Sequence, residues 1–246
     1  VEETAESISG NSVAGTSESE LVVSTEATRS QVDSNQTLTV TVEQSSESRV
    51  ERDTTSDRYS GTFSESATAT TESTRVEQSA NQGSTSTVTE HSNGSSTSNQ
   101  SGNSITGETA SHDQGSSTIS RTAVSSVASE SVSRSEILES TYESSGNSNL
   151  VTGSFVTETE TVSDSRLSSA LRNQTLEVRT DATSRETVTD SLEGNSLTGE
   201  YRSESTYHAT ASGAGRDLNQ VRKVDSTEET ETNRKTSESG NRISGT

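Results

Sequence analysis

The chain has no Cys, Pro, Met or Trp among its 246 residues. Without Cys it can form neither a disulfide framework nor a thiolate metal site. Without Pro, every residue keeps the backbone N–H that a β-ladder needs. Because no apolar run approaches the roughly 20 residues of a membrane-spanning helix, we expect no membrane insertion.

Large apolar side chains are also scarce. Hydrophobic residues make up 22% of the chain, against roughly 45–50% apolar residues in a typical domain, and the formal net charge is -20. Composition alone is therefore typical of a disordered, mucin-like spacer. The acidity also argues against nucleic acid and anionic membranes as partners.

What the chain does contain is a strict repeat of 46 residues. A glycine recurs at this spacing with no insertion or deletion, at Gly15, Gly61, Gly107, Gly153, Gly199 and Gly245. An apolar residue lies two positions before each glycine, at Val13, Tyr59, Ile105, Val151, Leu197 and Ile243. A disordered tract gains nothing from a fixed repeat length, so the period favours an ordered, stacked architecture.

The repeat divides the chain into units without linkers. The units are 1–15 (the end of one repeat), 16–61, 62–107, 108–153, 154–199, and 200–246, which holds a fifth repeat and the start of the next. We therefore expect the chain to be a window of a longer array.

Each unit contains two half-repeats, marked mainly by Asn. The markers follow one another at alternating steps of 24 and 22 residues: Asn11, Asn35, Asp57, Asn81, Asn103, Val127, Asn149, Asn173, Asn195, Asn219 and Asn241. Asn and Asp tolerate left-handed backbone conformations and bond their own backbone in tight turns. The spacing therefore predicts a turn at every marker, although Val127 departs from the residue pattern.

Between the markers the sequence favours β-strands. Thr is abundant, the stretch 37–42 alternates with period two, and Val stands five residues after the mid-unit marker in most units, as at Val40 and Val178. The stretches 119–139 and 162–172 also indicate strands, because neither combines a helix cap with a 3.6-residue period. We predict an all-β fold in which the repeats form an elongated antiparallel ribbon or spiral, each half-repeat giving one hairpin. The alternative is a parallel β-solenoid with two coils per unit.

The apolar residues around the glycines predict where a thin core would lie. Phe63, Phe155 and Tyr201 stand two residues after a unit-closing glycine. Residues four apart on one strand share a face, so Tyr59 with Phe63, Val151 with Phe155, and Leu197 with Tyr201 would form same-face pairs. We expect this face to be buried by stacking of unit on unit. We also expect the glycines to share one conformation, either at positive φ or packed too tightly for a Cβ.

The repeated motif also resembles a known class of sequence. The run Ser-Gly-Asn-Ser-apolar-Thr-Gly at 101–107, with variants at 194–201 and 239–245, is followed half a unit later by Asn-Gln-Thr-Leu at 35–38 and 173–176. This combination resembles tandem arrays in very large secreted bacterial proteins, above all planctomycete surface proteins, some of which also carry Tyr-Asp (YD/Rhs-type) repeats. The YD signature is absent here. The resemblance implies an extracellular, elongated and non-enzymatic module.

No catalytic constellation is present in the sequence. His91, His112 and His208 fall at different phases of the repeat and lack metal-ligand spacing, so we expect no enzyme activity and no cofactor. The acidic run 228–231 is a weak candidate for Ca²⁺, and solvated charge is the favoured interpretation. Candidate glycosylation sites are the four Asn-x-Ser/Thr sequons at Asn35, Asn93, Asn99 and Asn173.

The functional prediction follows from the repeat rather than from a site. We expect a structural fibre or stalk at the cell surface or outside the cell, self-associating or continued by a longer array, and glycosylated if the sequons are used. One alternative is an adhesin or biofilm-matrix module whose repeats contact glycan or mineral. Recurrent exposed aromatic residues would favour the adhesin, and buried ones the scaffold. The other alternative is the disordered spacer that the composition suggests.

Overall fold

The computed structural model describes residues 1–219 and 222–243, which form eleven β-strands and, within those ranges, no helix. The strands are β1 (Glu2–Asn11), β2 (Thr16–Ser34), β3 (Leu38–Asp57), β4 (Thr62–Asn81), β5 (Ser84–Asn103), β6 (Glu108–Val127), β7 (Glu130–Asn149), β8 (Ser154–Arg172), β9 (Leu176–Asn195), β10 (Glu200–Asn219) and β11 (Arg222–Asn241). The marker Asn219 ends β10, and Gly245 lies outside the described residues.

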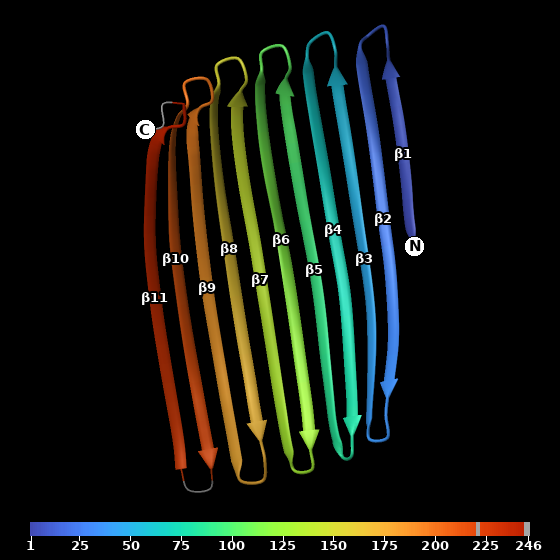
Figure 1. Cartoon of the computed structure of the whole chain (residues 1–246), viewed down its shortest axis with the longest axis vertical. Helices are drawn as coiled ribbons and strands as arrows, with labels where there is room; N and C mark the ends of the chain where they lie inside the picture. Colours follow the sequence, from blue (N-terminus) through green and yellow to red (C-terminus); the bar gives the residue numbers. More distant parts are fainter. Residues whose placement is uncertain (220–221, 244–246) are drawn as a thin grey trace.

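All the strands lie side by side in one open sheet, in the order in which they follow along the chain (Figure 1). Every neighbouring pair is antiparallel, so the chain runs up one strand and down the next. The predicted all-β antiparallel ribbon is confirmed, and the parallel solenoid is wrong. The described residues form a regular sheet rather than a disordered spacer.

The ladders between strands run without interruption. Strand β4, for example, pairs with β5 from Thr62 opposite Asn103 to Asn81 opposite Ser84. Such a ladder needs a backbone N–H at nearly every residue, which a chain without Pro provides. The stretches 119–139 and 162–172 lie in β6, β7 and β8 as predicted, although the first also contains the turn at 128–129.

The half-repeat markers lie where strands end. Each marker is the last residue of its strand, except Asn35 and Asn173, which directly follow one. At one edge of the sheet four residues connect the strands, as at 12–15, and at the other edge two or three do, as at 82–83 and 35–37. A strand of 20 residues with a connection of four or two residues gives the steps of 24 and 22, and the strands of 19 residues, β2 and β8, are followed by connections of three. Each half-repeat is therefore one strand with one turn, and the predicted hairpin per half-repeat is wrong.

The sheet is a single layer and has no core. Among the described residues no hydrophobic side chain is buried. The recurrent valines, such as Val40 and Val178, are only half-buried between their neighbours. Cohesion must therefore come largely from the hydrogen-bonded ladders and from contacts across neighbouring strands. Any function that the described sheet carries lies on its faces or edges.

Candidate functional site

A recurring five-residue turn occupies one edge of the sheet, at the top in Figure 1. Its last residue is the repeat glycine, and these glycines share one left-handed conformation, with φ between +74° and +79°: Gly15, Gly61, Gly107, Gly153 and Gly199. Glycine adopts this conformation without the strain that a Cβ causes in other residues. The expectation of one shared conformation at positive φ is confirmed for these five.

The marker residue organises each turn from within. In the turn at 103–107, the Oδ1 atom of Asn103 accepts hydrogen bonds from the backbone N–H groups of Ile105 (2.8 Å) and Thr106 (3.0 Å). The N–H of Gly107 donates to the backbone oxygen of Asn103 at 2.8 Å. The same side-chain contacts recur at Asn11, Asp57, Asn149 and Asn195. The turn therefore keeps one backbone geometry from unit to unit, although its other residues vary in type.

Successive turns are also bonded to one another, and we call this row of bonded turns the turn ladder. The backbone oxygen of Gly61 accepts the N–H of Ser104 at 2.8 Å, and Asn103 Nδ2 donates to the oxygen of Ser60 at 3.0 Å. The hydrogen bond to the glycine oxygen recurs at each later turn. The hydrogen bond from the side-chain amide recurs at Asn195 and Asn241. Units are therefore joined at this edge as well as along their strands.

The apolar residue of each turn lies over the glycine of the turn before it. A Cβ added to Gly61 would lie 2.6 Å from Cγ1 of Ile105, and the same relation joins the pairs Gly15–Tyr59, Gly107–Val151, Gly153–Leu197 and Gly199–Ile243. These residues stack from unit to unit, but they are not buried. The exposed fraction ranges from 61% at Leu197 to 86% at Val13.

The prediction of a buried face around the glycines is therefore wrong. Tyr59 lies in the turn while Phe63 lies in β4, so the two are not on one strand, and the same holds for Leu197 and Tyr201. The period-two argument fails because the chain reverses direction between the two members of each pair. Phe63, Phe155 and Tyr201 are half-buried on the sheet itself.

The turns at the opposite edge are less uniform. Asn35 and Asn173 each accept two backbone N–H groups on Oδ1, so their sequons lie in ordered turns. Between β4 and β5, Gln82 and Gly83 both have positive φ. Between β6 and β7 the turn forms without Asn, and Ala128 takes a φ of 49°. The other two sequons, at Asn93 and Asn99, are exposed on β5.

The uninterrupted register gives the sheet two faces of unlike chemistry. Directly opposite residues share a face, and faces alternate along a strand. One face holds the even-numbered residues of the odd-numbered strands and the odd-numbered residues of the even-numbered strands. We call it the glycine face, because every strand glycine lies on it: Gly10, Gly94, Gly102, Gly115, Gly146, Gly194, Gly213, Gly215 and Gly240. The other face, which we call the acidic face, carries most of the Asp, Glu and Thr and all three His.

Aromatic side chains on the glycine face cover some of its glycines. A Cβ on Gly102 would lie 2.8 Å from Phe63, and one on Gly194 would lie 2.8 Å from Phe155. Tyr201 stands opposite Gly240, and its hydroxyl donates to Glu238 at 2.6 Å. This bond is the main cause of the raised pKa of Tyr201. Such pairs protect backbone that glycine leaves open.

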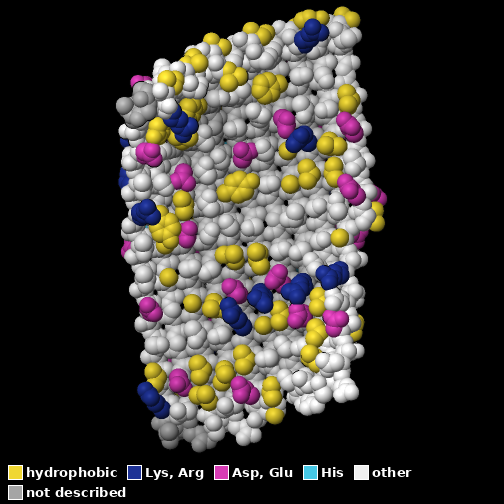
Figure 2. Space-filling model, in the orientation of Figure 1, with side chains coloured by type: hydrophobic (Ala, Val, Ile, Leu, Met, Phe, Trp, Pro, Cys, Tyr) yellow, Lys and Arg dark blue, Asp and Glu magenta, His cyan; other side chains and the backbone are white. Residues whose placement is uncertain are grey.

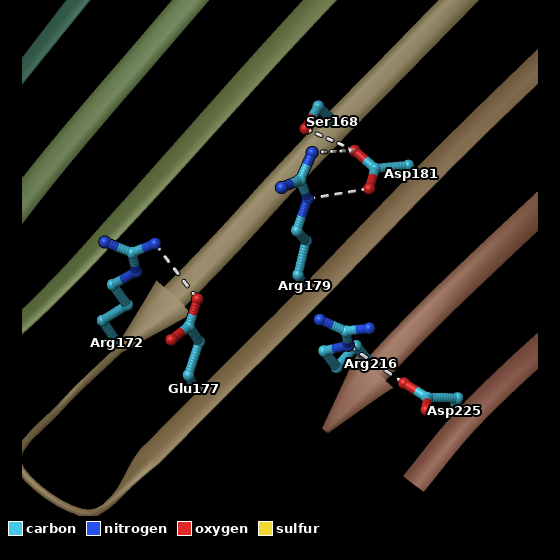
Figure 3. Close-up of polar contacts among 7 residues, drawn as sticks. All are labelled: Ser168, Arg172, Glu177, Arg179, Asp181, Arg216 and Asp225. Atoms are coloured by element: carbon cyan, nitrogen blue, oxygen red, sulfur yellow. Dashed lines mark hydrogen bonds and ion pairs between the residues drawn. The ribbon is translucent and has the colours of Figure 1, made fainter. Parts of the chain in front are cut away.

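An ionic cluster lies on the acidic face near the ends of β8 to β11 (Figure 3). Arg172 contacts Glu177 at 3.0 Å, and Arg216 contacts Asp225 at 3.0 Å. The Ser168 hydroxyl, followed by the Arg179 guanidinium, lowers the pKa of Asp181. For Asp225 the pKa is lowered by Lys223 and then by Arg216. The cluster is an exposed set of matched charges, and such pairs contribute little to stability.

Neither metal ligation nor a membrane-spanning helix is supported by the part of the chain that the structure describes. No group of three or more His, Asp or Glu side chains there could hold a metal ion, which gives the Ca²⁺ hypothesis no support. His91, His112 and His208 stand in different rows of the acidic face. Residues 1–219 and 222–243 contain no helix long and apolar enough to cross a membrane.

Comparison with known proteins identifies no family. No family model and no curated protein matches the chain. Among solved structures, the ferric yersiniabactin uptake receptor FyuA from Yersinia pestis is similar at a TM-score of 0.54 and 8% identity, covering 96% of this chain and 42% of the receptor. The chain thus spans less than half of that receptor's length. The transport unit of the autotransporter AIDA-I from Escherichia coli matches at a TM-score of 0.25 and 5% identity, over 90% of this chain and 83% of that one. At 8% identity, the likeness to the receptor shows a shared sheet architecture alone.

Proposed function

We propose that the chain is a structural, non-enzymatic module, a β-ribbon that lengthens by 46-residue units within an extracellular fibre or stalk. The observation that carries the proposal is the turn ladder. Each unit bonds to the next through the same backbone donor and acceptor positions, as Gly61 does with Ser104 and Gly153 with Ser196. A joint that is the same at every step allows units to be added without a new interface, as in other linear repeat proteins.

The repetitive all-β fold is compatible with either a structural or an adhesin-like role. An extracellular location is supported by the Ser- and Thr-rich acidic composition and by the resemblance to secreted repeat arrays. The exposed sequons at Asn93 and Asn99 would then be accessible to glycosylation enzymes. Further units of a longer array, or other copies of the chain, are the proposed partners.

Equilibrium unfolding tests the structural role. The comparison is between the full chain and a chain lengthened by one inserted copy of 154–199, both followed by circular dichroism in urea. We expect β-sheet spectra, cooperative unfolding and a higher urea midpoint for the longer chain, because each unit gains a bonded neighbour. Random-coil spectra for both chains would contradict the proposal.

A binding role for the turn edge is the second candidate. Its support is the recurrence of exposed apolar side chains at one site per unit, such as Tyr59, Ile105 and Leu197. Only Tyr59 in this row is aromatic, and Phe63, Phe155 and Tyr201 are half-buried elsewhere. Saturable binding to immobilised glycans or to hydroxyapatite, lost when Tyr59, Ile105 and Leu197 are all changed to Ser, would favour an adhesin. Equal behaviour of the parent and the triple variant would count against it.

A further inference from the structure

We infer that the glycine face is an interface, and that its occupant is the glycine face of a second copy of this chain. The inference deepens the proposed structural role and rests on it. A two-layered ribbon would have the apolar and aromatic side chains between the layers and both acidic faces outside.

The distribution of apolar side chains is the first argument. All aromatic residues of the strands lie on the glycine face: Phe63, Tyr142, Phe155, Tyr201 and Tyr207. Strand leucines also lie there, at Leu21, Leu38, Leu138, Leu167, Leu171, Leu176 and Leu192, whereas Leu218 is on the acidic face. Because glycine has no side chain, the glycines between them leave room for a second sheet to approach to the usual ~10 Å.

The arrangement of charges is the second argument. On the glycine face, Arg75, Glu90, Arg121 and Glu136 stand directly opposite one another on four successive strands, β4 to β7. Figure 2 shows Lys and Arg side chains gathered in an oblique band across the sheet, with Asp and Glu beside them. Neighbours in this row alternate in sign, so a second copy shifted by one strand would place each Arg opposite a Glu. This row of the face is thus electrostatically complementary to itself.

The acidic face has the opposite property. Glu26, Glu47 and Glu72 stand directly opposite one another on β2, β3 and β4, and Glu143 stands opposite Glu160 on β7 and β8. Like charges in direct opposition are destabilising unless water screens them. Covering this face with an equally acidic copy would remove that screening, so it must remain in solvent.

The available area is sufficient for a stable pair. The described chain exposes 16284 Å², of which a flat sheet presents roughly half on each face, whereas stable interfaces bury about 1,200–2,000 Å² in total. Two copies need to overlap over only part of their length. The overlap would be largest in fully aligned sheets and would still suffice in staggered ones.

A matched pair of neighbouring residues on β7 tests the inference. Leu138 lies on the glycine face and Ile137 on the acidic face. We expect the full chain to form a concentration-dependent dimer in sedimentation velocity, with a Kd at least tenfold higher for Leu138→Arg and unchanged for Ile137→Arg. Circular dichroism of each variant checks that the sheet is retained. If Leu138→Arg loses the β-spectrum, Ser96→Arg on the glycine face and Ser95→Arg on the acidic face of β5 replace the pair.

Three results would overturn the inference. They are a folded chain that stays monomeric at millimolar concentration, a dimer insensitive to the glycine-face substitution, and a dimer weakened equally by both substitutions. Edge-to-edge association of strands would give a dimer insensitive to the glycine-face substitution. Binding of a different molecule in place of a copy would leave the folded chain monomeric. Each leaves the structural role intact, because that role fails only if the full chain has no β-sheet spectrum.

Discussion

Ile105 lies over Gly61, although 44 residues separate them in the sequence, and a Cβ on Gly61 would come within 2.6 Å of its Cγ1 atom. The contact joins two consecutive turns of the turn ladder. It explains why both positions are fixed in every unit. The glycine supplies the positive φ and the space, and the apolar residue of the next unit occupies that space.

The turn glycines should therefore tolerate substitution poorly for two separable reasons, the positive φ and the lack of space for a Cβ. Gly153 has φ +75° and would place a Cβ 2.6 Å from Leu197, whereas Gly83 has φ +90° and Gly213 no positive φ, both with open space around the added atom. We expect a loss in free energy of unfolding of about 2–3 kcal/mol for Gly153→Ala and about 1 kcal/mol for Gly83→Ala, and a change within about 0.5 kcal/mol for Gly213→Ala. Urea titration measures all three. Equal stability of the Gly153→Ala and Gly213→Ala variants would show that the turn geometry is wrong.

The side-chain amide of the marker Asn should stabilise the fold through two separate sets of hydrogen bonds. Asn103 Oδ1 accepts two N–H groups of its own turn, and Nδ2 donates to Ser60 of the turn before. We expect Asn103→Ala to lower the free energy of unfolding by about 1–2 kcal/mol, and Asn103→Asp to lower it less at neutral pH, because Asp keeps the acceptor. If Ala and Asp at position 103 prove equivalent, the acceptor has no role.

Asp57 should make one turn sensitive to acid. Hydrogen bonds from the backbone N–H groups of Ser60, and then of Tyr59, hold the pKa of its carboxyl below the usual 3.8. A lowered folded-state pKa means a stabilising contribution that is present above the unfolded-state value and is lost as pH falls through the folded-state pKa. We expect Asp57→Asn to remove part of the stability loss below about pH 4. The measurement is the urea midpoint of parent and variant between pH 2.5 and pH 7. An identical pH profile for the two proteins would mean that Asp57 is not hydrogen-bonded in the folded state.

The sequence was sufficient to locate the turns, because their chemistry is local. Asn103 and Gly107 specify one turn whatever lies elsewhere, and the spacing of the markers determines the strand length. Even the turn after Val127, which lacks Asn, forms where the spacing predicts it. Local hydrogen bonding within a few residues is what a single sequence records best.

The environment of the apolar residues could not be predicted in the same way. Placing Tyr59 and Phe63 on one strand assumed that the glycine between them continued the strand, whereas its φ of +74° completes a reversal. A recurrent glycine is equally compatible with a positive φ and with close packing, so the sequence does not distinguish a turn from a tightly packed strand position. The sequence does contain a signal for the two faces. Strand glycines such as Gly102 and Gly194 fall on even positions of the odd-numbered strands, and those such as Gly115 on odd positions of the even-numbered ones.

The advance of the ribbon per repeat tests the central claim, that each 46-residue unit contributes two antiparallel strands to one sheet. Because the chain has no native Cys to remove, spin labels can be attached to Cys residues introduced in pairs at equivalent, exposed turn positions. The pairs are Ser60 with Thr152 and Ser60 with Thr198. These pairs are four and six strands apart, so double electron–electron resonance should give narrow distributions centred near ~19 Å and ~29 Å. Distances near twice these values would mean four strands per unit. Broad distributions that grow with the square root of the separation would mean that the chain has no such sheet.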